Sequence, residues 1–111
     1  MNINYINIID PGTRTPEIDC FNYMVAQTPL KLTYHLPALY GSDSLKTWDN
    51  PRGIIILGSG ASPTEKSLWQ TQLASWLQQQ WQRDVATLGI CYGHQLIAHM
   101  LRTNGLPLGG G

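Results

Sequence analysis

The residues best suited to chemistry are a cysteine and the glycines on either side of it. Cys91 lies between Gly89 and Gly93 and follows the apolar residues 85–88. Glycines two positions before and after a central residue are typical of a nucleophile elbow, a tight strand-to-helix turn in which side chains at the flanking positions would clash. The helix N-terminus that follows such a turn favours the reactive thiolate. The spacing therefore predicts that Cys91 is a nucleophile.

A second glycine turn provides a possible partner for this cysteine. Residues 58–61 (GSGA) follow the apolar run 54–57 (IIIL), which is typical of a strand buried on both faces. The carboxyl ends of parallel strands meet at one edge of a sheet, so we expect the two turns to be neighbours. The backbone N–H of Tyr92 and a donor from the 58–61 turn would then form an oxyanion hole.

The cysteines and histidines also have interpretations other than catalysis. A cysteine among apolar neighbours is often an inert core residue, and we expect this for Cys20. His94 follows Cys91 by three positions, but its ring would point along the flank of the helix, so we do not expect it to be the base. His94 and His99 are spaced poorly for a shared metal ion, and no cluster of Cys and His is present. We expect no metal site.

The surrounding sequence predicts the elements that position these turns. Its patterning indicates strands at residues 3–9, 31–36, 54–57 and 85–90, and helices at residues 16–27, 62–81 and 93–102. Residues 37–52 are expected to form a loop. This alternation predicts an α/β fold in which a mainly parallel open sheet carries helices on both faces.

Two of the predicted helices have clear local features. Ser62, Pro63 and Glu65 combine a capping box with proline at the first helical position. The same helix has a core-facing side, made of Trp69, Leu73, Trp76, Leu77 and Gln80. In the helix at 16–27, the side chains expected to face the core are those of Phe21, Met24 and Val25.

Composition excludes several broad classes. The 111 residues have a formal net charge of zero, and only 13% are charged. Without a basic patch there is no electrostatic case for binding nucleic acid or an anionic membrane. No apolar run approaches the roughly 20 residues that span a bilayer, and residues 1–5 do not resemble a secretory signal. We expect a cytoplasmic protein with reduced cysteines and no cofactor.

Two motifs resemble class I glutamine amidotransferases. Residues 89–95 (GICYGHQ) are similar to the family signature Gly-(Ile/Val)-Cys-x-Gly-His-Gln. Residues 54–62 resemble the family's oxyanion strand and glycine loop. The helix carrying Trp69 and Trp76 is similar to the GMP-synthase-like branch, although Leu68 stands where proline is common. Together the matches cover roughly residues 53–102.

The resemblance implies a flavodoxin-like fold and a reaction. Cys91 would attack the side-chain amide of glutamine, forming a thioester and releasing ammonia to a synthetase domain or subunit, and water would then release glutamate. The oxyanion would be held by the backbone N–H groups of Tyr92 and Gly60. Gln95 and Gly58 would contact the bound glutamine.

The sequence departs from the family in two respects. Ala61 follows Gly60 where the family usually has proline. More seriously, the family's catalytic His and Glu belong to a His-x-Glu segment near the domain's C-terminus, and neither residue type occurs after His99. We therefore expect residues 1–111 to be the N-terminal part of a domain. Its uncovered sheet edge and helix faces would favour association.

The sequence is compatible with three functions. The first is a glutaminase domain whose longer parent is active, with no turnover expected from residues 1–111 alone. The second is a non-catalytic amidotransferase-like binding module. The third is an elbow-cysteine hydrolase of the γ-glutamyl-hydrolase or peptidase type, against which Gln95 argues.

Overall fold

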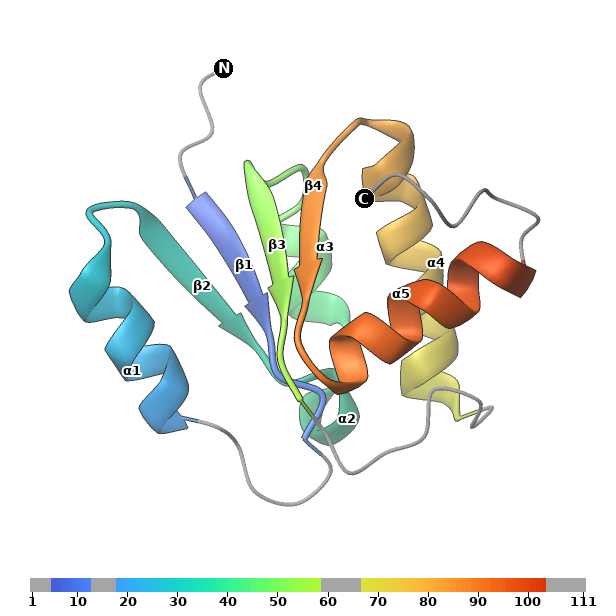
Figure 1. Cartoon of the computed structure of the whole chain (residues 1–111), viewed down its shortest axis with the longest axis horizontal. Helices are drawn as coiled ribbons and strands as arrows, with labels where there is room; N and C mark the ends of the chain where they lie inside the picture. The colour runs from blue at the N-terminus through green and yellow to red at the C-terminus, as the bar shows by residue number, and fades with distance from the viewer. Residues whose placement is uncertain (1–4, 13–17, 59–66, 104–111) are drawn as a thin grey trace.

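The computed structural model describes residues 5–12, 18–58 and 67–103, and these form an α/β fold (Figure 1). The elements in chain order are β1 (Tyr5–Ile9), α1 (Ile18–Gln27), β2 (Lys31–His35), α2 (Pro37–Tyr40), α3 (Asp43–Thr47), β3 (Gly53–Ile56), α4 (Leu68–Gln82), β4 (Ala86–Gly89) and α5 (Tyr92–Thr103). The predicted α/β class and parallel sheet are confirmed. No helix in the described part is both long and apolar enough to cross a membrane.

The four described strands form one parallel sheet in the order β2-β1-β3-β4. In this register Ile9 lies opposite both His35 of β2 and Ile56 of β3, and Ile56 lies opposite Gly89 of β4. The carboxyl ends of all four strands are therefore aligned at one edge of the sheet. Cys91 follows the end of β4 at this edge.

The core lies on one face of the sheet. Ile9, Ile54 and Ile56 point to this face, because side chains along a strand alternate and the parallel register aligns them. Helices α3, α4 and α5 cover it, and their buried apolar side chains are Leu45, Leu73, Trp76, Leu77, Tyr92, Leu96 and Met100. Burying a large apolar side chain stabilises the fold by about 1.5–3 kcal/mol, so this face holds most of the packing energy.

The opposite face is covered much less. Phe21 of α1 stacks on Tyr34 of β2, with ring centroids 4.4 Å apart and planes 16° apart. Helices on both faces are thus confirmed. Phe21 and Met24 are half-buried, but Val25 is 48% exposed, so its predicted core position is wrong. The reason is that α1 packs only over β2, at the edge of the sheet.

Two helix assignments from the sequence also need correction. The predicted loop at 37–52 contains α2 and α3, which form because Pro37 starts a helical turn and Leu45 is fully buried. Helix α4 begins at Leu68, since Ser67 before it has extended backbone (φ −74°, ψ 154°). The predicted capping residues lie in 59–66, outside the described residues. The core-facing side of α4 is confirmed.

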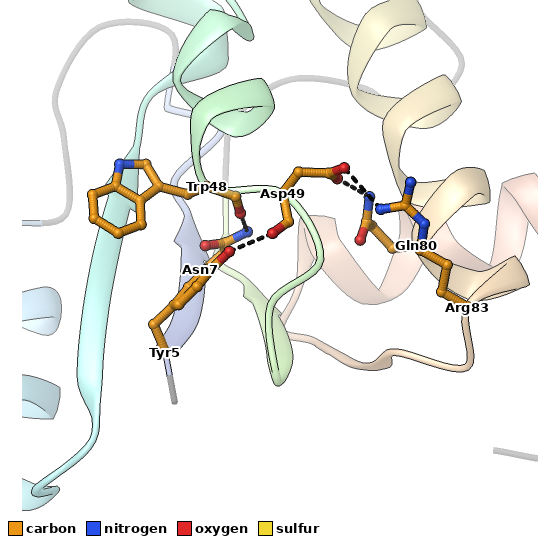
Figure 2. A network of polar contacts seen from close by, with 6 residues as sticks. All are labelled: Tyr5, Asn7, Trp48, Asp49, Gln80 and Arg83. Carbon is orange, nitrogen blue, oxygen red and sulfur yellow. Dashed lines mark hydrogen bonds and ion pairs between the residues drawn. The ribbon is translucent and has the colours of Figure 1, made fainter. Parts of the chain in front are cut away.

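A polar network fastens the C-terminal end of α4 (Figure 2). The carboxylate of Asp49 accepts a hydrogen bond from Gln80 Nε2 at 2.6 Å and from Arg83 Nη1 at 2.8 Å. Burial opposes ionisation of Asp49, but the hydrogen bonds from Arg83 and Gln80 outweigh it and hold its pKa below the usual value. Tyr5 donates to the backbone carbonyl of Asp49. The loop before β3 thus ties α4 to β1.

A second polar network joins β1, β2 and α3. Asn7 donates to the carbonyl of Trp48 at 3.0 Å and accepts from Thr33 Oγ1 at 2.6 Å. Thr33 Oγ1 lies 2.7 Å from His35 Nε2, and His35 Nδ1 lies 2.7 Å from Ser44 Oγ. Because the hydroxyl proton of Thr33 is directed to Asn7, Nε2 of His35 donates to Thr33 and Nδ1 accepts from Ser44. Burial lowers the pKa of His35 to about 4, which keeps the ring neutral.

Candidate functional site

The turn between β4 and α5 holds Cys91 in an unusual backbone conformation. Its φ is 53°, in the left-handed region that residues other than glycine rarely adopt. Such strain costs on the order of 1–3 kcal/mol and persists only where the surroundings impose it. The side chain of Cys91 is exposed at the carboxyl edge of the sheet. A strained, exposed thiol between a strand and a helix has the geometry of a nucleophile elbow.

The glycines on either side explain how the turn is imposed. A Cβ added to Gly89 would lie 2.4 Å from the carbonyl carbon of Gly93. A Cβ added to Gly93 would lie 2.4 Å from the carbonyl oxygen of Ile56 in β3. No real Cβ approaches backbone so closely, so both positions require glycine. The backbone N–H of Ile90 also donates to the carbonyl of Ile56 at 2.9 Å, which fastens the turn to β3.

The end of β3 lies directly beside the elbow. A Cβ added to Gly58 would lie 3.4 Å from the Cβ of Cys91. The structure thus brings Gly58 and Cys91 together from two neighbouring strands, 33 positions apart in the sequence. Gly60, the predicted second oxyanion donor, lies outside the described residues.

Tyr92 and Gln95 lie in the first turn of α5. Tyr92 is the first residue of the helix, where backbone N–H groups point along the axis towards the elbow. Its ring is buried, and its hydroxyl donates to Gln70 Oε1 of α4 at 2.6 Å. Gln95 is exposed, and its backbone N–H donates to the carbonyl of Cys91 at 3.0 Å. The side chain of Gln95 therefore faces solvent, one helical turn after the thiol.

Neither His94 nor His35 is placed as a base for Cys91. His94 is exposed on α5, and no hydrogen bond joins it to the thiol among the described residues. His35 belongs to β2, three strand spacings from β4, which is about 14 Å at the usual spacing of parallel strands. The described residues also contain no group of three or more His, Cys, Asp or Glu that could hold a metal ion.

Cys20 does not have the predicted core position. It is exposed on α1, and both cysteines are free thiols. The prediction is wrong because α1 buries no side chain fully and turns the Cys20 position away from the strand beneath it. The protein therefore has two accessible thiols that differ in backbone conformation, one in a helix and one in the strained turn. This makes Cys20 an internal reference for the reactivity of Cys91.

Sequence reasoning missed the contribution of Gln70 to this site. Gln70 is only 4% exposed, although glutamine is usually a surface residue. Its position beside Trp69, on the apolar side of α4, was the available indication of burial. The sequence did not reveal its partner, because Tyr92 lies 22 positions later and on another helix.

The chain is similar to known proteins in its sequence pattern and in its fold. The family model described as glutamine amidotransferase class-I matches residues 17–104. A solved structure, a glutamine amido transferase from Methylobacillus flagellatus, has a similar fold, with a TM-score of 0.61 and 17% sequence identity. The similarity covers 90% of this chain and 39% of that one, so this chain spans well under half of its neighbour's length. No curated protein matches.

Proposed function

Because the chain belongs to the class I glutamine amidotransferase family, we propose that it carries the nucleophile with which a longer assembly releases ammonia from glutamine. The observation that carries the proposal is the backbone of Cys91, held at a φ of 53° with an exposed thiol between two obligatory glycines. An inert core cysteine would need neither the strain nor the exposure.

The proposed reaction uses this chain's residues as follows. The thiolate of Cys91 attacks the side-chain amide carbon of glutamine, and a C–S bond forms while the carbonyl electrons move to oxygen. The backbone N–H of Tyr92 donates to this oxyanion. When the carbonyl re-forms, the C–N bond breaks and ammonia leaves with the proton that the base took from the thiol of Cys91. Water then attacks the thioester, which restores the thiol and releases glutamate.

Two further residues would bind the substrate. Gly58 would contact glutamine beside the elbow, where a Cβ on residue 58 would lie 3.4 Å from the Cβ of Cys91. Gln95 would contact glutamine from the first turn of α5. Gly60 would be the second oxyanion donor, as the resemblance implies. Ammonia would pass to an acceptor on a synthetase domain or subunit, and membership of the GMP-synthase-like branch remains a prediction for this domain.

The base for this reaction is proposed to come from outside residues 1–111. We propose that these residues form the N-terminal part of an amidotransferase domain, and that a His-x-Glu segment in a longer parent or a partner completes it. A non-catalytic amidotransferase-like binding module is the second candidate. The two candidates differ in whether Cys91 recognises glutamine.

A glutamine analogue with a chloroketone at the γ position distinguishes them. We expect it to label Cys91 stoichiometrically and an excess of glutamine to slow this labelling, because recognition needs the elbow and the glycine turn but no base. Mass spectrometry of the digested protein locates the label. Cys91→Ser should abolish labelling, and Cys20→Ser should leave it unchanged. Labelling at Cys20 instead, or no protection by glutamine, would overturn the proposed function.

Turnover provides a second, independent measurement. We expect residues 1–111 to release no glutamate from glutamine above the rate seen with Cys91→Ser, because the chain lacks the family's catalytic His and Glu. A coupled glutamate assay with the purified chain tests this. Measurable turnover that Cys91→Ser abolishes would show that the base lies within these residues.

A further inference from the structure

We propose that Gln70 is a positioning residue for the elbow, acting through the side chain of Tyr92. The inference deepens the proposed function and rests on it, because it names the group that aligns the Tyr92 backbone N–H with the developing oxyanion. Gln70 would touch neither glutamine nor the thiol.

The contact itself joins two buried side chains from different helices. The hydroxyl of Tyr92 donates to Gln70 Oε1 at 2.6 Å, with Tyr92 1% exposed and Gln70 4% exposed. Trp69 lies beside the same ring, with centroids 6.2 Å apart. A hydrogen bond in such a dry environment is strongly directional. It therefore fixes the tyrosine ring in one orientation with respect to α4.

That orientation matters because Tyr92 follows the strained residue directly. The peptide group between Cys91 and Tyr92 carries the N–H that would donate to the oxyanion, and it follows directly on the strained backbone of Cys91. A turn held in a strained conformation relaxes when its supports are removed. The glycines support the turn from the strand side, through Ile56. The bond from Gln70 supports it from the helix side, through the ring of Tyr92.

Core packing alone does not account for this pair. An apolar residue at position 70 would fill the same space beside Leu73 and Trp69 without the cost of burying an amide. The polar pair instead specifies one arrangement of α4 and α5. Gln80 offers a direct comparison, since it is a fully buried glutamine on the same helix that donates to Asp49 at 2.6 Å. It lies ten residues further on, about 15 Å along the helix axis, away from the elbow.

The test compares two electrophiles at Cys91, in the full chain with Cys20→Ser so that one thiol remains. The chloroketone analogue of glutamine needs the oxyanion donor as well as the thiol. Iodoacetamide needs only an accessible thiol, because its displacement reaction forms no oxyanion. The ratio of the two rate constants therefore reports the alignment of the Tyr92 N–H and cancels general changes in exposure or stability.

We expect Gln70→Met to lower this ratio about three- to tenfold, the effect of losing one hydrogen bond of ordinary strength. Tyr92→Phe should lower it equally, and the double variant should show no further loss, because both changes remove the same contact. Gln80→Met is the matched control: it also removes a buried hydrogen bond of α4, but it should leave the ratio within about twofold of the parent value.

The outcomes separate this inference from the proposed function. If the parent chain is labelled by the chloroketone but Gln70→Met keeps its ratio, the positioning role is wrong and the proposed function stands. Equal losses in Gln70→Met and Gln80→Met would also overturn it, since the effect would then be a general one. If the parent chain is not labelled at Cys91 at all, the proposed function fails and the positioning role fails with it.

Discussion

The backbone of Cys91 is held in a conformation that costs stability. A φ of 53° is unfavourable for any side chain, and the protein retains it at an exposed position where the thiol is not needed for packing. Backbone contacts help to impose the strain, since Gly89 and Gly93 let the chain approach itself and Ile56 closely.

This strain predicts an unusual preference at position 91. Cys91→Gly should be more stable than Cys91→Ala by about 1 kcal/mol, because glycine adopts the left-handed region without a steric penalty. Urea unfolding of the two variants measures the difference. Position 20 is the control, since it lies in helix α1, where Cys20→Gly should be less stable than Cys20→Ala by about 1 kcal/mol. The same sign at both positions would contradict the strained turn.

At the scale of elements, the site is made by two neighbouring strands that end side by side. Strand β3 ends beside Gly58, and β4 ends at Gly89, opposite Ile56. Helix α5 starts so close to β3 that position 93 has no space for a methyl group. The distance between this helix and this strand therefore sets where the thiol lies. The network around Asp49 fastens the far end of α4, so that its first turn keeps its place against Tyr92.

The closeness of α5 and β3 makes Gly93 highly sensitive to substitution. Gly93→Ala should lower the free energy of unfolding by at least about 2 kcal/mol, because the added methyl group collides with rigid backbone. Gly53→Ala, in β3 itself, should change it by less than about 1 kcal/mol, since the nearest atom would be 3.8 Å away. Urea unfolding checks both. If Gly93→Ala fails to fold while Gly53→Ala folds, the prediction holds, whereas equal stability of the two variants contradicts it.

At the scale of the whole molecule, the two faces of the sheet differ sharply. One face is covered by α3, α4 and α5 and contains the core. On the other, α1 packs over β2, while Leu88 of β4 is 58% exposed and Ile90 after it is 43% exposed, among the described residues. Exposed apolar side chains on a sheet face favour association. The neighbour of known structure is a much longer chain, of which this one covers 39%.

We therefore expect the 111-residue chain to self-associate and Leu88→Gln to weaken the association. The substitution should change the free energy of unfolding by less than about 0.5 kcal/mol, because the side chain buries little. Sedimentation velocity at several concentrations measures the association, and urea unfolding measures the stability. Leu77→Ala, in the buried core, should instead cost about 2–5 kcal/mol. If the parent chain is monomeric and Leu88→Gln strongly lowers its free energy of unfolding, Leu88 does not lie on an exposed face that drives association.

Much of the fold could be predicted, because strands and glycine turns have local patterns. The apolar run at 54–57 predicted β3, and the core-facing side of α4 was correctly placed from Trp69 to Gln80. The errors occurred where packing overrides local preference. Helix α3 forms within the predicted loop because Leu45 is buried in the core. Val25 and Cys20 are exposed because α1 lies at the edge of the sheet. The sequence placed the start of α4 before Leu68, because Ser62, Pro63 and Glu65 together match the pattern of a helix N-terminus.

The candidate site, like the fold, could be predicted from the sequence only in part. The sequence by itself determined that residues 89–93 form an elbow, because the need for glycine on either side of Cys91 arises within five consecutive residues. Only the tertiary structure decided that Gly58 lies against Cys91 and that Gln70 bonds to Tyr92. Those contacts depend on strand order and on how each helix is rotated on the sheet, and both are set by packing between residues that are distant in the chain.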